Sequence, residues 1–291
     1  MKESVGQRFF NIFNNLLMIA LSIITVYPIY YVRAASLSDP ARLIAHRNLL
    51  LMPAGWSLEA YELAFRNPML LSGYGNTLII VVGGVCLNLT MTAIGAYFLS
   101  RWNAVLVKPA MIFIVFTMFF SGGLIPFYLT VRQFQLDNTL WALIIPTAIS
   151  TFNLIVMRTA FMQIPVELEE SFHMDGATHR TILLRLTLPL SMPVVAVMIL
   201  FYGVSHWNAW FHAMIFISNR NLYPLQLVLN EILIQNDTNA MLLGVDSFDK
   251  GLVDETLKYA IIIIATLPIL ILYPYLQKYF VKGVMIGALK G

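Results

Sequence analysis

The stretch "VELEESFHMDGATHRTILLRLTLPL" (Val166–Leu190) holds the densest cluster of acidic residues in an otherwise apolar chain. Three of its acidic residues, Glu167, Glu169 and Glu170, stand at its start, and the dipole of a helix favours negative charge in the first turn. Gly176 follows, and glycine suits the left-handed conformation that ends many helices. The stretch therefore predicts a short helix, a sharp turn and a second helix.

The chain around this stretch has the composition of a membrane protein. Of its 291 residues, 59% are hydrophobic and 11% are charged, whereas soluble domains have about 25% charged residues. Long uncharged runs recur, and a membrane-spanning helix needs roughly 20 apolar residues. Strands of a membrane barrel would show short alternating segments instead. The prediction is an all-α integral membrane protein.

Six transmembrane helices are predicted from the uncharged runs. They lie at about Phe10–Val32, Asn76–Ser100, Pro109–Val131, Thr139–Met157, Thr187–Phe211 and Tyr259–Phe280. The first apolar stretch has about 24 residues, whereas signal peptides have apolar regions of about 7–15, so we expect an uncleaved span. Residues 1–66 would form the first span and an outer loop, and 67–291 the core, with an outer loop at 212–258 and a C-terminal tail at 281–291.

The distribution of Lys and Arg sets the expected orientation. With both termini in the cytoplasm, ten basic residues lie in inside segments and eight in outside segments, and the inside segments are much shorter. The elbow, which we define as residues 163–189, would then face the cytoplasm.

Several functions are excluded or disfavoured by what the sequence lacks. No segment reads G-x-x-x-x-G-K-[ST], so we expect this chain not to hydrolyse ATP and to bind no cofactor or metal of its own. The predicted spans carry no Asp, Glu, Lys or Arg well inside, whereas ion-coupled carriers usually do. A net charge of +3 gives no reason to expect nucleic acid, and with Cys86 as the one cysteine no intrachain disulfide is possible.

The elbow has two interpretations from its residues alone. Leu168 and Phe172 are four residues apart and would form a narrow apolar stripe, rimmed by carboxylates, that suits docking to another protein. A solvated amphipathic connector would show the same pattern.

The elbow also resembles the EAA-loop signature of the permeases of binding-protein-dependent ABC importers. The matching residues are Glu170, Asp175, Gly176, Ala177, Leu188 and Pro189. Ser171 and Phe172 stand where that family usually has two alanines, which implies a differently shaped receiving groove. The resemblance implies a type I importer fold with a cytoplasmic coupling helix, and contact with an ATPase through Glu167, Glu169, Glu170, Phe172, Asp175, Gly176, Ala177, Leu188 and Pro189.

Other stretches resemble the carbohydrate branch of this family. "YPYLQKYFVKGVMIGALKG" (Tyr273–Gly291) is similar to the C-terminus of the maltose/maltodextrin-type permease subunit, and "LYPLQLVLNEIL" is similar to the subgroup that serves complex oligosaccharides. The resemblance implies four kinds of partner: a homologous second permease in a heterodimer, two cytosolic ATPases that carry ATP and Mg, an extracytoplasmic sugar-binding protein, and membrane lipid. It implies a bacterial plasma (inner) membrane location.

Two groups of residues are candidates for contact with cargo and with the binding protein. Aromatic faces with amide donors suit sugar rings, and Phe201–Ala213 carries Tyr202, His206, Trp207, Asn208 and Trp210. An aromatic belt at the membrane interface, with a hydrogen-bonded structural histidine, would give the same pattern. The resemblance implies binding-protein contact in 219–239, with candidates Asn219, Arg220, Tyr223, Gln226 and Asn230.

The function that combines these observations is import of oligosaccharides, with polyuronide fragments of alginate or pectin as candidate cargo. The same machine with another cargo, such as peptide or glycerol phosphate, stays open. A stand-alone secondary transporter is the alternative from a different class. A membrane enzyme is disfavoured because no catalytic pair stands in the spans.

Overall fold

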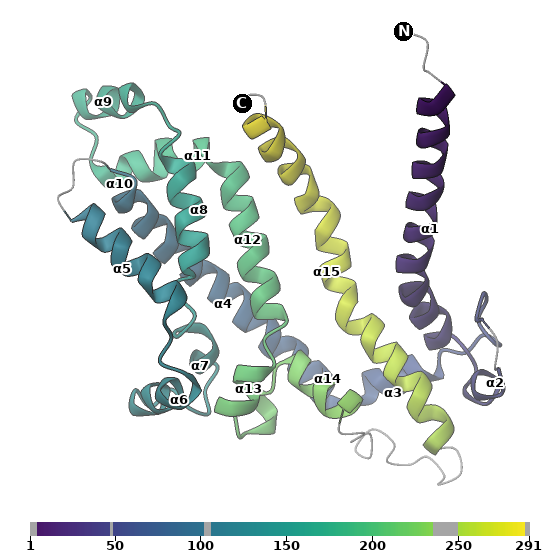
Figure 1. Ribbon diagram of the computed structural model, residues 1–291. Coiled ribbons are helices and arrows are strands. Elements are labelled where there is room, and N and C mark those ends of the chain that lie inside the picture. Colours follow the sequence, from purple (N-terminus) through teal and green to yellow (C-terminus); the bar gives the residue numbers. More distant parts are fainter. Residues whose placement is uncertain (1–4, 47–48, 102–105, 235–249, 289–291) are drawn as a thin grey trace. The chain divides into compact units, whose positions relative to one another are not determined.

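A computed structural model describes residues 5–46, 49–101, 106–234 and 250–288, and this part of the chain is almost entirely helical (Figure 1). Its single β-type pairing is an isolated bridge between Ser38 and Trp56. The prediction of an all-α protein is confirmed. The chain forms two compact units: Met1–Pro68 with Glu231–Leu267, and Met69–Asn230 with Pro268–Gly291. The first division lies next to the predicted boundary at residue 66, but the first unit also takes in 231–267.

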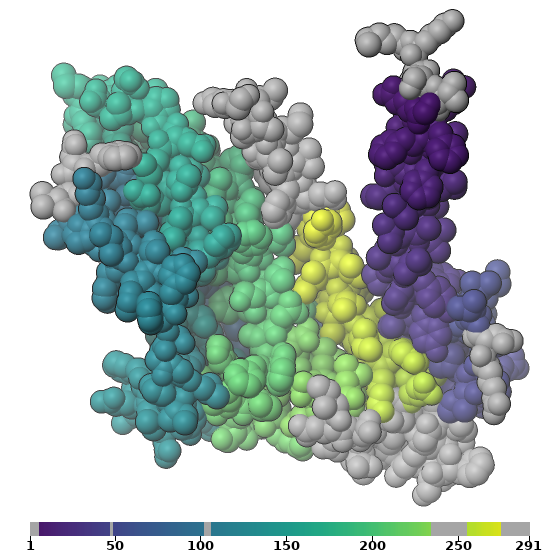
Figure 2. Space-filling model, in the orientation of Figure 1, coloured from purple at the N-terminus to yellow at the C-terminus, as the bar shows by residue number. Residues whose placement is uncertain are grey.

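The first unit is built around one long apolar helix and two short ones. Helix α1 (Val5–Ser36) exposes apolar side chains along most of its length (Figure 2), and α2 (Pro40–Ala45) and α3 (Glu59–Arg66) follow it. Asp39 caps α2 by accepting a hydrogen bond from the Arg42 amide. The small core of this unit consists of Ala34, Ala35, Leu43 and Leu50, with Tyr31, Ala54 and Tyr259 packed against it.

The second unit contains the elbow and most of the core. Its first helix, α4 (Pro68–Leu99), is followed by α5 (Val107–Phe119), α6 (Leu124–Gln133), α7 (Trp141–Ile144), α8 (Thr151–Phe161), α9 (Val166–Met174), α10 (His179–Ile182), a π-helical turn η1 (Leu183–Thr187), α11 (Leu188–Leu190), α12 (Met192–Trp207), α13 (Phe211–Phe216), a 3-10 turn η2 (Arg220–Leu222) and α14 (Leu225–Ile234). The last residues of α14, from Glu231 on, belong to the first unit, and helix α15 (Lys250–Ala288) begins in the first unit and ends in the second. The predicted tail at 281–291 is helical to Ala288, and its last residues lie outside the described part.

The number of unbroken membrane-length helices is smaller than predicted. Within the described residues, three helices are long and apolar enough to span a bilayer: Gly6–Ser36, Pro68–Leu99 and Glu255–Pro274. Two further pairs pass the same test together but bend by 116° (α5 with α6) and by 86° (His179–Leu190 with α12). The predicted fourth span at Thr139–Met157 is divided between the short helices α7 and α8. The count of six spans is therefore not confirmed.

Proline and glycine account for the breaks. Gly123 has φ +84° between α5 and α6, and Pro146 stands two residues after the end of α7. Pro193 stands in the first turn of α12, where its missing N–H removes the bond that would continue the preceding helix. Absence of charge marks the apolar run in the sequence, but these residues decide where the helix inside it ends.

The largest core of the second unit lies between α4, α8, α10 and α12. Its buried members include Tyr97, Met157, Phe161, Ile182 and Met198. Phe172 and Ala177 of the elbow pack against this core, and its member Tyr202 also lines a large cavity.

Candidate functional site

The elbow has the predicted shape, and its turn is a complete Schellman motif. Helix α9 ends at Met174, and Gly176 adopts φ +76°. The amide of Gly176 donates to the His173 carbonyl at 3.0 Å, and the amide of Ala177 donates to the Phe172 carbonyl at 2.9 Å. Thr178 then caps α10 by accepting from the Thr181 amide at 3.4 Å, so the second helix begins at His179, two residues later than the predicted start near Ala177.

The predicted apolar stripe on α9 does not face outward as a unit. Phe172 is half-buried and packs against the large core together with Ala177, whereas Leu168 is exposed. These two core contacts hold α9 and the start of the next helix on the same surface. The exposed apolar residues of α9 are Val166, Leu168 and Met174.

The acidic residues of the elbow divide into an outward set and one inward residue. Glu167, Glu170 and Asp175 are exposed, as a docking surface requires. Glu169 is buried, with 7% of its surface exposed. Its carboxylate forms an ion pair with Arg101 and accepts a hydrogen bond from the Tyr97 hydroxyl at 3.3 Å. The guanidinium of Arg101 also lies over the Tyr97 ring, 4.3 Å from its centroid.

This buried contact joins α9 to the C-terminal end of α4. Tyr97 is in the last turn of α4, and Arg101 follows its end. Arg158 of α8 donates through Nε to the carbonyl of Leu99 at 2.8 Å, so the same helix end is also held by α8. A charged residue pointing inward from a surface helix breaks the expected pattern of exposed acids, and nothing near Glu169 in the sequence identifies Arg101 as its partner.

The predicted junction at Leu188 and Pro189 is a distorted helix. Leu188 is half-buried against the core, and Pro189 is exposed. The π-helical turn Leu183–Thr187 directly precedes them. Pro189 has no N–H to donate to the carbonyl of Arg185, four residues before it. In a π-helical turn the hydrogen bonds join residues five apart, so this turn does not depend on that bond.

A cavity of about 1170 Å³ opens in the second unit beside the breaks in the apolar runs. This volume exceeds the range of roughly 300–1,000 Å³ that is common for small-molecule sites. Among the described residues that line it, none is Asp, Glu, Lys or Arg. Its polar and aromatic lining includes Ser121, Phe127, Thr147, Ser150, Asn153, Phe201, Tyr202, Ser205, His206, His212 and Tyr273.

Buried hydrogen bonds fix two of the lining residues. The Tyr202 hydroxyl bonds to Thr92 Oγ1 at 2.7 Å and accepts from the Ser150 amide at 3.2 Å. The Nε2 of His206 donates to Asn88 Oδ1 at 2.7 Å, and the Asn88 amide donates to the Thr147 carbonyl at 2.5 Å. These bonds tie α12 to α4 and to the break after α7, so this wall of the cavity is pre-organised.

The five predicted cargo residues do not come together at one site. Tyr202 and His206 line the large cavity, and His206 is also the hydrogen-bonded histidine of the alternative interpretation. Trp207 is buried and lies instead in a separate apolar groove with Val81, Val85 and Leu272, and its ring meets Tyr74 edge-on. Asn208 and Trp210 are exposed beyond the end of α12 and are not among the lining residues.

Sequence reasoning missed most of the polar lining. Thr147, Ser150 and Asn153 stand within the predicted fourth span, one to seven residues after Pro146. A proline followed by three hydrogen-bonding side chains inside an uncharged run was the signal, because polar residues in a span face the protein interior or a water-filled cavity.

The candidates for binding-protein contact lie on η2 and α14. Asn219 and Arg220 are exposed, whereas Tyr223, Gln226 and Asn230 are half-buried. Asn76 near the start of α4 donates to the carbonyls of Asn221 and Tyr223 at 2.8 and 3.1 Å. The remainder of the predicted outer loop, 235–249, lies outside the described residues.

A family model agrees with this architecture. Residues 91–286 match the family "Binding-protein-dependent transport system inner membrane component". The chain belongs to this family. The permease is therefore a multi-pass inner-membrane component of a transport system that depends on a binding protein, as the elbow indicated.

Several relatives of the permease have names that state a carbohydrate cargo. It is 39% identical to Protein LplC of Bacillus subtilis (strain 168) over 100% of this chain and 98% of the relative. It is 36% identical to the polygalacturonan/rhamnogalacturonan transport system permease protein YtcP of the same organism, over 96% and 97%. Its structure is similar to a chain in the crystal structure of a bacterial ABC transporter involved in the import of the acidic polysaccharide alginate, with TM-score 0.88, 31% identity and coverage of 96% and 99%.

Proposed function

We propose that the permease moves oligosaccharides, and in particular fragments of acidic polysaccharides, into the cytoplasm as the membrane subunit of an ABC importer. The elbow is the observation that carries the transport mechanism: an exposed acidic helix ends in a glycine-dependent turn and stands on the core that builds the cavity wall. The named cargo of the relatives and of the similar structure supports the choice of sugar.

The elbow would be the contact for the ATPase. Glu167, Glu170 and Asp175 present carboxylates to a partner, and Phe172 and Ala177 transmit displacement of α9 to the core. ATP and Mg would bind to the partner subunits, because this chain has no nucleotide-binding motif. Closure of the ATPases would favour the permease conformation to which the closed ATPase pair binds more tightly, by the difference between its affinities for the two conformations.

The assembly would contain a homologous second permease, two ATPases and an extracytoplasmic binding protein. Both termini would be cytoplasmic, since the denser basic segments then lie inside. The segment from Asn219 to Asn230 would contact the binding protein. The dependence of the family on a binding protein removes the support for a stand-alone secondary transporter.

The cavity suits a hydroxylated cargo. Its Ser, Thr, Asn and Tyr side chains both donate and accept hydrogen bonds, and its aromatic rings can stack on the CH faces of sugars. The described lining residues supply no fixed charge. We infer that it holds the hydroxyl face of an acidic sugar, and that carboxylate recognition belongs to other parts of the importer.

The coupling role is tested by Gly176→Pro. Proline fixes φ near −65°, whereas Gly176 has φ +76°, and the variant also removes the amide that donates to His173. We expect the variant to insert in the membrane but to lose co-purification with its ATPase. Gly75→Ala is the control, because nothing lies within 4 Å of the added Cβ. Retained complex and transport in Gly176→Pro would contradict the coupling role.

The cargo is tested with the assembled importer and its binding protein in proteoliposomes. We expect ATP-driven uptake of oligogalacturonides or alginate oligosaccharides, and no uptake of short peptides or glycerol phosphate. Uptake of one of the latter, without uptake of any oligosaccharide, would assign another cargo to the same machine.

A further inference from the structure

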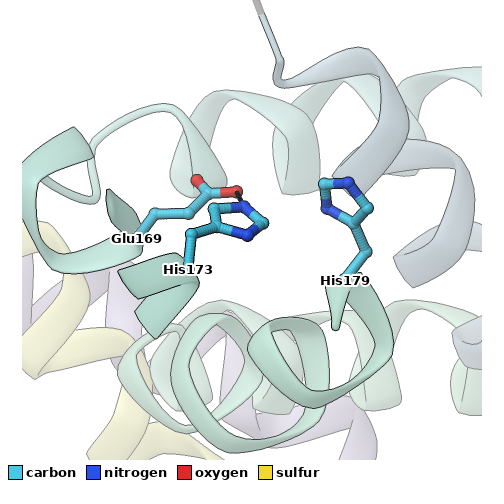
Figure 3. Close-up of side chains that lie close together, drawn as sticks. All are labelled: Glu169, His173 and His179. Atoms are coloured by element: carbon cyan, nitrogen blue, oxygen red, sulfur yellow. Dashed lines mark ion pairs between the residues drawn. The ribbon is translucent and has the colours of Figure 1, made fainter. Parts of the chain in front are cut away.

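Two histidines of the elbow converge on the inner glutamate. Glu169 and His173 are one turn apart on α9, and His179 begins α10 on the other side of the Gly176 turn (Figure 3). One ligand atom from each of the three side chains lies within 4.8 Å of the other two. The rings of His173 and His179 meet edge-on with their centroids 5.1 Å apart.

The spacing of the three ligand atoms is slightly longer than that of ligands around a shared cation. His173 Nε2 and Glu169 Oε1 are 3.9 Å apart, which is too long for a hydrogen bond. A metal ion at about 2.0–2.2 Å from each of two ligands bridges ligand atoms that are roughly 3.3 Å apart in a tetrahedral site. The His173 side chain is 43% exposed, which leaves it room to rotate toward a bound ion.

The neighbours of the cluster are already arranged as supports. The Tyr97 hydroxyl lies 3.3 Å from Glu169 Oε1 and 3.2 Å from His179 Nδ1, so one residue orients two of the three ligands. Arg101 pairs with the second oxygen of Glu169, Oε2, and leaves Oε1 on the side of the histidines. Groups that hold the ligands in this way are a regular part of metal sites in proteins.

We propose that Glu169, His173 and His179 bind a divalent transition-metal ion of the Zn²⁺ type. Two imidazoles and one carboxylate suit Zn²⁺, whereas Mg²⁺ and Ca²⁺ prefer oxygen ligands alone. Three protein ligands leave a fourth position for water or for a group from a partner. The bound ion links α9 to α10 across the Gly176 turn and so stiffens the elbow.

The test uses the assembled importer, purified without a histidine tag, stripped with EDTA and loaded with Zn²⁺ in the absence of nucleotide. We expect one more tightly bound Zn²⁺ per permease chain in the wild type than in the double variant His173→Ala/His179→Ala. Each single variant weakens that binding at least tenfold. His46→Ala removes an exposed histidine outside the cluster and retains wild-type binding.

A second measurement distinguishes loss of the metal site from misfolding of a variant. Zn²⁺ slows hydrogen exchange of the α9–α10 amides at least tenfold in the wild type and leaves it unchanged in His179→Gln, a variant that keeps a polar side chain. Equal Zn²⁺ content in the wild type and the double variant overturns the proposal, as does a site filled by Mg²⁺ in preference to Zn²⁺. Neither readout depends on transport, so failure here is separate from failure of the importer function.

Discussion

Replacing Glu169 by alanine should release α9 from the end of α4 while leaving the rest of the core intact. Glu169 is buried and forms an ion pair with Arg101, and the variant removes the carboxylate partner of that guanidinium, which keeps its contact with the Tyr97 ring. Removing one member of a buried pair costs about 3–5 kcal/mol. The Arg101 side chain is 26% exposed and regains some water, so we take the lower end, about 3 kcal/mol.

This energy should appear as local opening of the elbow. Because a factor of ten corresponds to about 1.4 kcal/mol, we expect exchange of the α9 amides to accelerate about 100-fold in Glu169→Ala, measured by hydrogen exchange on the purified complex. Arg101→Ala should give an effect of similar size, and the double variant should cost less than the sum of the two. The matched control is Glu170→Ala, whose side chain is exposed one residue away. Equal acceleration in Glu169→Ala and Glu170→Ala would refute the reasoning.

Three further predictions concern packing, the cavity wall and the first unit. Gly84→Ala places a Cβ against the His206 ring, 2.7 Å from Cδ2, and should destabilise the protein by about 1–3 kcal/mol in a thermal unfolding assay. The control Gly83→Ala, whose added Cβ has its nearest neighbouring atom at 3.5 Å, should be neutral or stabilising. Tyr202→Phe leaves the Ser150 amide without its partner and should cost about 1–3 kcal/mol of stability, whereas Tyr273→Phe on the same cavity should cost less than half of that. Asp39→Ala removes the N-cap of α2 and should destabilise that helix by about 1 kcal/mol, so hydrogen exchange should accelerate in α2 alone. Unchanged hydrogen exchange would show that the hydrogen bond from the Arg42 amide does not hold the helix.

The elbow could be predicted from the sequence because its determinants are local. The acidic first turn, Gly176 and the following cap all lie within a few residues of one another, and the structure reproduces the helix, the turn and the second helix. The Glu169 contact could not be predicted in this way. Its partner Tyr97 is 72 residues away, and the sequence pattern placed the carboxylate with its exposed neighbours.

The cavity shows the same limit. Absence of charge located the apolar runs, but the lining depends on where those runs break and on which broken ends meet. Gly123, Pro146 and Pro193 interrupt runs that hydropathy alone makes continuous. Tyr202 and His206 were identified by residue type, but their buried partners Thr92 and Asn88 lie on a helix far away in the sequence.

Helix α4 has a mechanical consequence for the importer. Its 32 residues form a rod about 48 Å long, with no proline after its first position. Its N-terminal third carries Asn76 and Thr77, which form hydrogen bonds with the segment proposed to meet the binding protein, and its last turn contacts α9 through Tyr97. In the proposed importer, the binding protein and the ATPases would therefore contact two separated parts of the same helix, and docking of the binding protein would be transmitted to the ATPases through α4 rather than through the cargo.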